Sequence, residues 1–229
     1  MSTALVSIED QVEIPYDLRT LDEFRAWTHS DDFPEQGRID YIDGRIEVDL
    51  TSENPFTHGT PKVAITHVLL PFADEHDFGW LFSDRTRIVS VAANLSAEPD
   101  LVFITEESLA EGRVKPIPGK TGSNENDDNI VEFEGGPDLI VEIVSNSSVK
   151  KDTVRLPKAY FAAGVREYWL VDVRRGQMVF TIHARSKTEF VPQVSDADGF
   201  QASAVLKSRF LLTRRQTPSG RWRYRLAVQ

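Results

Sequence analysis

Apolar residues recur at helical spacing in three parts of the chain. Leu21, Phe24 and Trp27 fall on one helical face. Thr20 and Glu23 have the spacing of a capping box, so a helix is predicted from residue 20 through 27. Similar signals predict two further helices, one from the N-cap and proline at 60–61 to residue 70, ended or kinked by Pro71, and one over 152–163, capped by Gly164.

The remaining apolar runs predict β-strands. Alternation over 38–50, interrupted by Asp43-Gly44, predicts a β-hairpin. The run DLIVEIVS (138–145) is β-branched and continuous, which is typical of a central strand covered on both faces. Residues 111–136 are polar and rich in glycine and proline, so we expect a loop there. Further strands are expected at 80–82, 87–92 and 101–105, and a second hairpin at 167–173 with 178–184.

This order of elements predicts an α/β or α+β fold, in which helices pack on a mixed central sheet. With 229 residues the chain is long enough for one substantial core. We expect an irregular N-terminal arm over 1–19 and a single domain over 20–229 that ends in a basic strand region. No run of 18 apolar residues and no signal-peptide pattern is present, so we expect a cytoplasmic protein without a membrane segment.

Composition narrows the chemistry. The chain has no cysteine, so a metal ion must be held by carboxylate, imidazole, carbonyl or water, which favours Mg²⁺ over structural zinc. Residues 1–149 carry 10 Lys and Arg against 30 Asp and Glu, whereas residues 150–229 carry 16 against 6, giving −20 and +10 within the total of −10. The basic part could contact phosphate. An acidic protein whose sequence halves form no separate surfaces explains the same numbers equally well.

Glu142 is the residue that most needs an explanation. It interrupts the apolar strand 138–145, and an unpaired carboxylate there costs several kcal/mol or becomes protonated. A bound metal ion would compensate its charge. A partner arginine or lysine, or a position at the sheet edge in water, would do so as well.

Asp100 strengthens the metal interpretation. It precedes another apolar strand in PDLVFI (99–104), and two such strands side by side would bring Asp100 and Glu142 to one Mg²⁺. This ion would polarise a phosphodiester and lower the pKa of the attacking water. Asp138 is a further candidate ligand, or else an acid of the turn before its strand.

Four segments carry a family resemblance. PDLVFI (99–104), PDLIVEIVSNSSVKKD (137–152), AYFAAGVREYWLVDV (159–173) and the upstream YIDGRIEVDL (41–50) resemble the bacterial Uma-type restriction endonucleases, a branch of the PD-(D/E)XK nuclease superfamily. The resemblance covers roughly residues 38–183. It implies a restriction-endonuclease-like fold, metal-dependent hydrolysis of phosphodiester bonds, and a nucleic acid as partner. Members of this family are often dimeric, so a homodimer is a further expectation.

The resemblance assigns Asp100 to the first acidic position and Glu142 to the second, both as metal ligands. The superfamily lysine would stand at residue 144 or, in this family, at residue 156, but Val144 and Leu156 occupy these positions. Lys150, Lys151 and Lys158 are the nearby substitutes. We favour Lys151, because it stands at the helix start, beside the end of the strand that bears Glu142. Such a lysine would position water or stabilise charge on phosphate.

Two lesser candidates come from the upstream segment. Glu47 would add a carboxylate from the first hairpin, although the family often has a glutamate at the position of Arg45. His58 matches a histidine often seen in the family and would orient water or phosphate. A lone histidine before a helix is more often a capping or surface residue.

The C-terminus offers a candidate nucleic-acid contact. In RWRYRLAV (221–228), Arg221, Arg223 and Arg225 alternate with larger apolar residues, so a strand would show three guanidinium groups on one face. That face could follow a phosphate backbone. An edge strand whose charges prevent aggregation has the same pattern.

The sequence therefore predicts a metal-dependent endonuclease that acts on DNA with Mg²⁺, or with Mn²⁺ as the alternative ion. A catalytically impaired relative that binds nucleic acid or a protein partner is the second hypothesis, and the missing lysine favours it. A third is a sugar hydrolase that uses two acids without metal. No phosphate-binding glycine loop, nucleophile elbow or redox-cofactor fingerprint is present.

Overall fold

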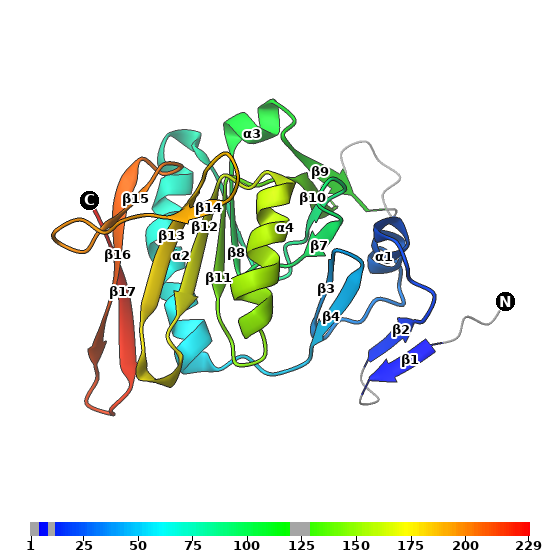
Figure 1. Ribbon diagram of the computed structural model, residues 1–229, viewed down its shortest axis with the longest axis horizontal. Helices are drawn as coiled ribbons and strands as arrows, with labels where there is room; N and C mark the ends of the chain where they lie inside the picture. The colour runs from blue at the N-terminus through cyan, green and yellow to red at the C-terminus, as the bar shows by residue number, and fades with distance from the viewer. Residues whose placement is uncertain (1–4, 9–11, 120–128) are drawn as a thin grey trace.

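The computed structural model describes residues 5–8, 12–119 and 129–229. Within these ranges no helix has both the length and the apolar character needed to cross a membrane. The chain forms two six-stranded sheets and two smaller ones. Both large sheets are mixed, and helices cover them, so the predicted α+β fold class is confirmed (Figure 1).

The central sheet is built around the apolar strand that the sequence singles out. Strand β11 lies between β12, which is parallel to it, and β8, which is antiparallel. Helices pack on both faces of the sheet at this strand, which explains why its residues are all buried. In spatial order the strands are β14 (Phe190–Pro192), β13 (Val179–Arg185), β12 (Glu167–Asp172), β11 (Leu139–Ile143), β8 (Leu101–Thr105) and β5 (Gly79–Ser83).

Two helices cover opposite faces of this sheet (Figure 1). Val141 and its odd-numbered neighbours in β11 pack in one core with Ile65 and Leu69 of α2 (Thr60–Asp74). Ile140 points the other way, into a core with Tyr160 of α4 (Leu156–Ala163). The strand alternation therefore places Glu142 on the α4 face, the same face as Ile140.

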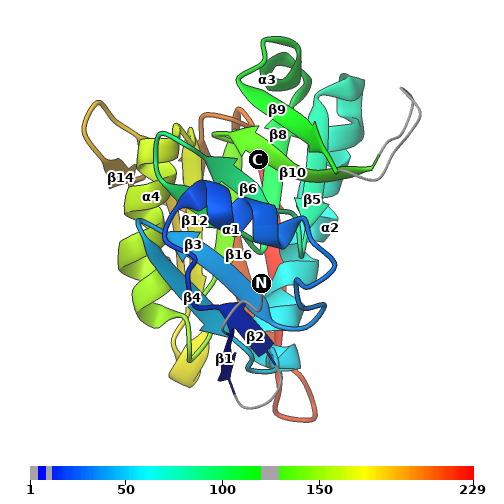
Figure 2. The ribbon, with the colours of Figure 1, turned by 90° about the vertical axis from the view of Figure 1, so that its right-hand side faces the viewer.

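The second large sheet lies beside the α4 face and is covered by α1 (Leu21–Thr28), which crosses it in Figure 2. Phe24 and Trp27 of α1 pack against Ile39 and Tyr41. In spatial order its strands are β4 (Arg45–Asp49), β3 (Arg38–Ile42), β7 (Leu95–Ala97), β6 (Ile88–Ser90), β10 (Ile130–Gly135) and β9 (Val114–Pro118).

Two smaller sheets and the short helix α3 (Glu106–Ala110) complete the fold. Strands β16 and β17 pack on α2, with Phe210 and Leu226 in its core. A short helix follows β8. The elements are the sheet β15 (Gln201–Ser203), β16 (Ser208–Gln216) and β17 (Trp222–Val228), the pair β1 (Leu5–Ile8) and β2 (Val12–Pro15), and α3 (Glu106–Ala110).

Several sequence-based expectations are confirmed. The capping box of Thr20 and Glu23 opens α1. Strands β3 and β4 form the predicted hairpin, and both turn residues, Asp43 and Gly44, have positive φ. Strands β12 and β13 form the second hairpin, and Gly164 ends α4 in the left-handed conformation.

Other expectations are wrong or incomplete. The segment 111–136, expected as a loop, contains β9 and β10, which pair with each other; its residues 120–128 lie outside the described part. The N-terminal arm contains the paired strands β1 and β2. Helix α2 continues past Pro71 to Asp74, because Phe72 and Ala73 pack in the core under the central sheet. Proline removes one N–H from that helix but does not outweigh this packing.

Asp138, at the start of β11, proves to be a structural acid. It is fully buried and accepts hydrogen bonds from Thr105 N at 2.8 Å and from Ser108 Oγ at 3.0 Å. Arg113 and Arg166 form ion pairs with its Oδ1. At about 3.3 Å per residue, Asp138 stands some 13 Å along the strand from Glu142.

We expect Asp138→Ala to lower the free energy of unfolding by about 3 kcal/mol, because it leaves buried donors without an acceptor. Urea unfolding followed by circular dichroism measures this change. Exposed Glu107 is the control, since Glu107→Ala should change stability by less than about 0.5 kcal/mol. Equal stability of the two variants would contradict the structural role of Asp138.

Candidate active site

Asp100 and Glu142 lie opposite each other across two antiparallel strands. The last residue pair of β8 and β11 is Leu101 with Val141, and the next step along both strands brings Asp100 beside Glu142. The backbone N–H of Ile143 donates to Asp100 Oδ2 at 2.7 Å. Both acids are buried, with 0% and 1% of their surface exposed. The sequence-based expectation that the two carboxylates are neighbours agrees with this geometry.

Three basic side chains surround Asp100. Arg38 of β3 donates to Oδ1 at 2.9 Å, and the Nζ atom of Lys62 in α2 lies 3.3 Å from the same oxygen. The Nε2 atom of His58 lies 3.2 Å from Oδ2. These residues come from three separate elements, so the site forms only when the second sheet and α2 both dock on the central sheet.

The pKa values follow from these contacts. Burial raises the pKa of Asp100, but the bond from His58 and the charge of Arg38 lower it more, so it stays well below its ordinary value. Burial lowers the pKa of His58, but its contacts with Asp100 and Glu53 outweigh this effect and raise the pKa to about 9. Asp100 is therefore ionised and His58 is protonated at neutral pH.

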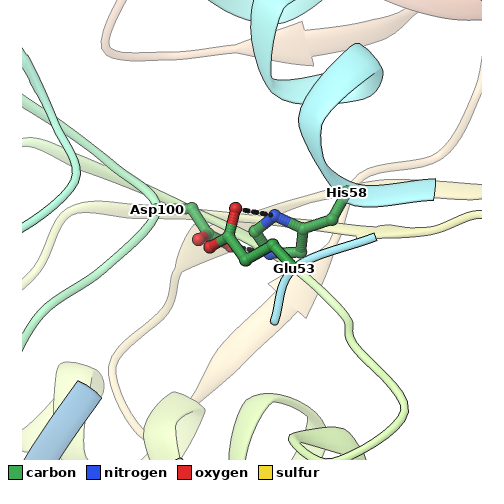
Figure 3. Close-up of side chains that lie close together, drawn as sticks. All are labelled: Glu53, His58 and Asp100. Atoms are coloured by element: carbon green, nitrogen blue, oxygen red, sulfur yellow. Dashed lines mark ion pairs between the residues drawn. The ribbon is translucent and has the colours of Figure 1, made fainter. Parts of the chain in front are cut away.

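His58 also connects Asp100 to Glu53 (Figure 3). Its Nδ1 atom lies 3.0 Å from Glu53 Oε2, on the opposite side of the ring from Asp100. One ligand atom of each residue lies within 4.8 Å of the others. The histidine stands in a π-helical turn, Pro55–Gly59, which leads into α2 and is capped by the Asn54 side chain. This turn, directly before the start of α2, places the imidazole in the site.

Glu142 has the opposite electrostatic environment. Its Oε1 atom accepts a hydrogen bond from the Tyr160 hydroxyl at 2.6 Å, but its buried Oε2 atom has no hydrogen-bond partner. Burial and the neighbouring charge of Asp100 raise the pKa of Glu142 well above its ordinary value. The protein thus holds a buried carboxyl group whose negative charge Arg38 and Lys151 offset only in part.

Lys151, the lysine favoured from the sequence, interacts with the buried acids Asp40 and Glu142. Its Nζ atom donates to Asp40 Oδ2 at 2.8 Å, and both side chains are buried. Burial lowers the pKa of Lys151, but the charges of Asp40 and Glu142 raise it above its ordinary value. The lysine reaches the site from a π-helical turn, Lys151–Arg155, that precedes α4.

Asp40 and Asp152 are acids of this cluster that the sequence analysis missed as candidates. Asp40 alternates with apolar Ile39 and Tyr41 in the first hairpin, and this pattern normally indicates a solvent-facing position. Asp152 accepts a bond from Ser148, and burial raises its pKa to about 6. No local signal identifies either residue, because the surface that buries them comes from distant segments.

Glu47 and Lys158 lie at the margin of the cluster. Glu47 stands across from Asp40 in the hairpin register, but its carboxylate binds Arg155 at 2.5 Å. Lys158 is exposed on α4, where it lines a hollow with Arg45 and Arg155. No contact joins Lys158 to Asp100 or Glu142 in the described residues.

A cleft of about 290 Å³ leads to this cluster from the surface. Arg38 and His58 line its inner part, whereas Glu53, Asp84 and Ser145 are among the residues at its walls. Asp100 lies directly behind Arg38 and His58, which contact it. The lining of the cleft combines the basic residues Arg38, Arg85 and His58 with the acids Asp49, Glu53, Asp84 and Glu98, so a substrate would meet side chains of both charges in front of the buried acids.

The three arginines that the sequence suggests as nucleic-acid contacts lie at one edge of the small sheet. They are far along the chain from the residues of this cleft. Strand β17 is the outer strand, and Arg223 and Arg225 are exposed while Tyr224 and Leu226 are buried. Arg221 precedes the strand and is also exposed. The predicted alternation is confirmed, and a nucleic-acid contact of this face stays a prediction.

Comparison with known proteins agrees with the resemblance. The sequence profile of the Uma2 family, described as "Putative restriction endonuclease", matches residues 21–211. The fold is similar to the crystal structure titled as a "putative nuclease belonging to DUF820" from Anabaena variabilis, with a TM-score of 0.59, 17% identity, and 82% of this chain and 90% of that chain covered. No curated protein matches the chain.

The chain thus belongs to a family of restriction-endonuclease type. That family is Uma2, and its description supports nuclease activity and a nucleic-acid substrate. The structural similarity independently supports the nuclease-like fold, since the overlap covers most of both chains.

The two central acids should respond oppositely to removal of their charge. In EDTA at pH 7, Asp100→Asn should lower the free energy of unfolding by about 3–5 kcal/mol, because it leaves buried cations unpaired. Glu142→Gln should cost little or stabilise the fold, because the raised pKa shows that ionised Glu142 is unfavourable. Urea unfolding of both variants tests this contrast, and a larger loss in Glu142→Gln would contradict it.

Proposed function

We propose that this protein is a metal-dependent endonuclease that hydrolyses phosphodiester bonds in DNA. The observation that carries the proposal is the pair of buried acids, Asp100 and Glu142, which lie at adjacent strands behind Arg38 and His58 of the cleft. Membership of the Uma2 family supports the nuclease class. The metal, the DNA substrate and the hydrolytic reaction are the parts of the proposal that experiment must test.

The residues present fit a divalent cation. Glu142 Oε2 is buried and has no hydrogen-bond partner among the described residues, so it is available as a ligand. Asp100 and Glu142 would together hold the ion. Both ligands are carboxylates, which suit Mg²⁺ or Mn²⁺. Glu53 offers a further carboxylate oxygen close to Asp100. Such an ion supplies Lewis-acid polarisation of the phosphodiester and a lowered pKa for bound water.

The basic residues have separate roles in this proposal. Arg38 lines the cleft and bonds Asp100 through Nη2, so its other N–H groups are free of that contact and can bind a phosphate oxygen. His58, protonated below about pH 9, can donate a hydrogen bond to the same phosphate. Lys151 holds Asp40 in place and adds positive charge beside Glu142.

A binding module without catalytic activity is the second candidate. The observation in its favour is that Asp100 is already neutralised by Arg38, Lys62 and His58. A metal ion must compete with these cations for the same oxygens. A chain that binds DNA but never cleaves it would support this candidate.

Cleavage of supercoiled plasmid tests the leading proposal. With Mg²⁺ or Mn²⁺ we expect nicking that EDTA abolishes and that falls at least about 100-fold in Glu142→Ala and Asp100→Ala, because each removes a ligand. Titration calorimetry should show loss of metal binding in the same variants. Glu107→Ala, which removes an exposed acid, should cleave like the wild type. Nicking that persists in EDTA would contradict the metal requirement.

Lys151 and Lys158 provide a second test within the site. Lys151→Met keeps the length of the side chain but removes its charge, and we expect cleavage to fall about 100-fold or more. Lys158→Met removes an exposed charge from α4 and should leave the rate within about twofold. Circular dichroism of both variants checks that they fold. Equal rates would remove Lys151 from the proposed mechanism.

A further inference from the structure

A second hollow lies on the other side of the π-helical turn that carries His58. It has a volume of about 930 Å³ and runs between the start of α2 and the turn that joins β16 to β17. Figure 1 shows α2 and β17 side by side at this point. Two aromatic rings are exposed in the groove, Phe56 at 43% and Trp222 at 37%. Exposed aromatic rings in one groove indicate a binding surface.

The charge of this groove is opposite to that of the chain. None of its fourteen lining residues is an aspartate or glutamate, although the chain has 36 acidic residues and 26 basic ones. Arg221, Arg223 and His67 are its ionisable basic residues. A groove that combines aromatic rings with cations and lacks acids is complementary to a polyanion that also carries flat apolar groups.

Cation–π contacts hold the two rings in place. The guanidinium carbon of Arg221 lies 4.8 Å from the centre of the Phe56 ring. That of Arg214 lies 4.1 Å from the Trp222 ring. The contact of Arg221 with Phe56 joins the hairpin turn to the segment before α2, whereas the contact of Arg214 with Trp222 lies within the hairpin. Both contacts orient the rings before a ligand arrives. A ligand that stacks on the rings therefore loses less conformational entropy on binding.

The groove is continuous in sequence with the candidate active site. Phe56 is two residues from His58, and both belong to the turn Pro55–Gly59. His58 lines the cleft in front of Asp100, whereas Phe56 lines the groove. The turn Pro55–Gly59 thus contributes residues to the linings of both the groove and the cleft.

We infer that the groove binds unpaired nucleotides of the substrate strand. Bases stack on Phe56 and Trp222, and Arg221 and Arg223 contact the phosphates. Unpaired nucleotides are required because bases inside a duplex already stack on their neighbours and expose only their edges. The inference rests on the proposed nuclease function, which sets the path of the bound strand from the groove toward the buried acids. It makes single-stranded DNA, or a duplex with an unpaired flank, the preferred substrate.

Fluorescence anisotropy in EDTA tests the groove without cleavage. The probes are a labelled single strand of about 12 nucleotides and the matching duplex. We expect the full-length wild type to bind the single strand more tightly. Phe56→Ala and Trp222→Ala should each weaken that binding about 5- to 150-fold, which corresponds to the loss of one stacked base. Trp222→Phe keeps an aromatic ring and should recover most of the affinity.

Trp80 provides the matched control. It is a tryptophan that is 54% exposed on β5 and does not line the groove. Trp80→Ala should therefore bind both probes like the wild type. Unchanged single-strand binding in Phe56→Ala and Trp222→Ala, with all variants folded by circular dichroism, would overturn the inference.

Two further outcomes separate the groove from its rivals. If the groove joins two copies of this chain, Trp222→Ala will convert a dimer to a monomer in sedimentation and leave oligonucleotide binding unchanged, which overturns the inference. Failure of the proposed reaction is recognised separately. Ring-dependent binding of the single strand, without metal-dependent cleavage of either the single strand or the plasmid, would keep the groove and reject the endonuclease, whereas metal-dependent cleavage without ring dependence would do the reverse.

Discussion

The negative charge of Asp100 is the constraint on which the site depends. A carboxylate with no exposed surface is costly unless cations and hydrogen-bond donors surround it. Arg38 supplies this from the second sheet, His58 from the turn before α2, and the N–H of Ile143 from β11. One charge at a strand end therefore connects both large sheets and a helix, and the cleft forms where these elements meet.

The cations that pair with Asp100 leave Glu142 without an ion-pair partner among the described residues. Asp100 and Glu142 are neighbours, and two such carboxylates cannot both ionise in a buried site without added positive charge. Arg38 and Lys62 lie against Asp100, and Lys151 bonds Asp40, so the fixed cations are already engaged. The raised pKa of Glu142 expresses this imbalance. A divalent cation in the proposed nuclease would supply the missing positive charge, which connects the buried acid pair to the proposed chemistry.

Local patterns in the sequence predicted the parts of this arrangement that lie within single elements. The apolar run of β11, the hairpin turn at Asp43-Gly44 and the acid pair were readable because alternation and apolar length identify buried strands. Asp40 and Arg38 were missed as members of the cluster, because the polar face of a hairpin becomes buried only when distant segments cover it. Strands β9 and β10 were missed for a similar reason. Their polar composition suggests a loop, and pairing with each other stabilises them.

Leu156 stands where the family usually has a lysine, and the structure shows why an apolar residue suits this position. Leu156 is 1% exposed and packs with Ile140 and Tyr160 in the core beneath α4, so an ammonium group there would need its own buried partner. The π-helical turn before α4 instead brings Lys151 against Asp40, an acid of the other sheet. In the proposed nuclease, the lysine charge that acts on Glu142 thus comes from the start of this turn, and the core beneath α4 stays apolar. The ion pair with Asp40 then makes the position of this charge depend on docking of the second sheet.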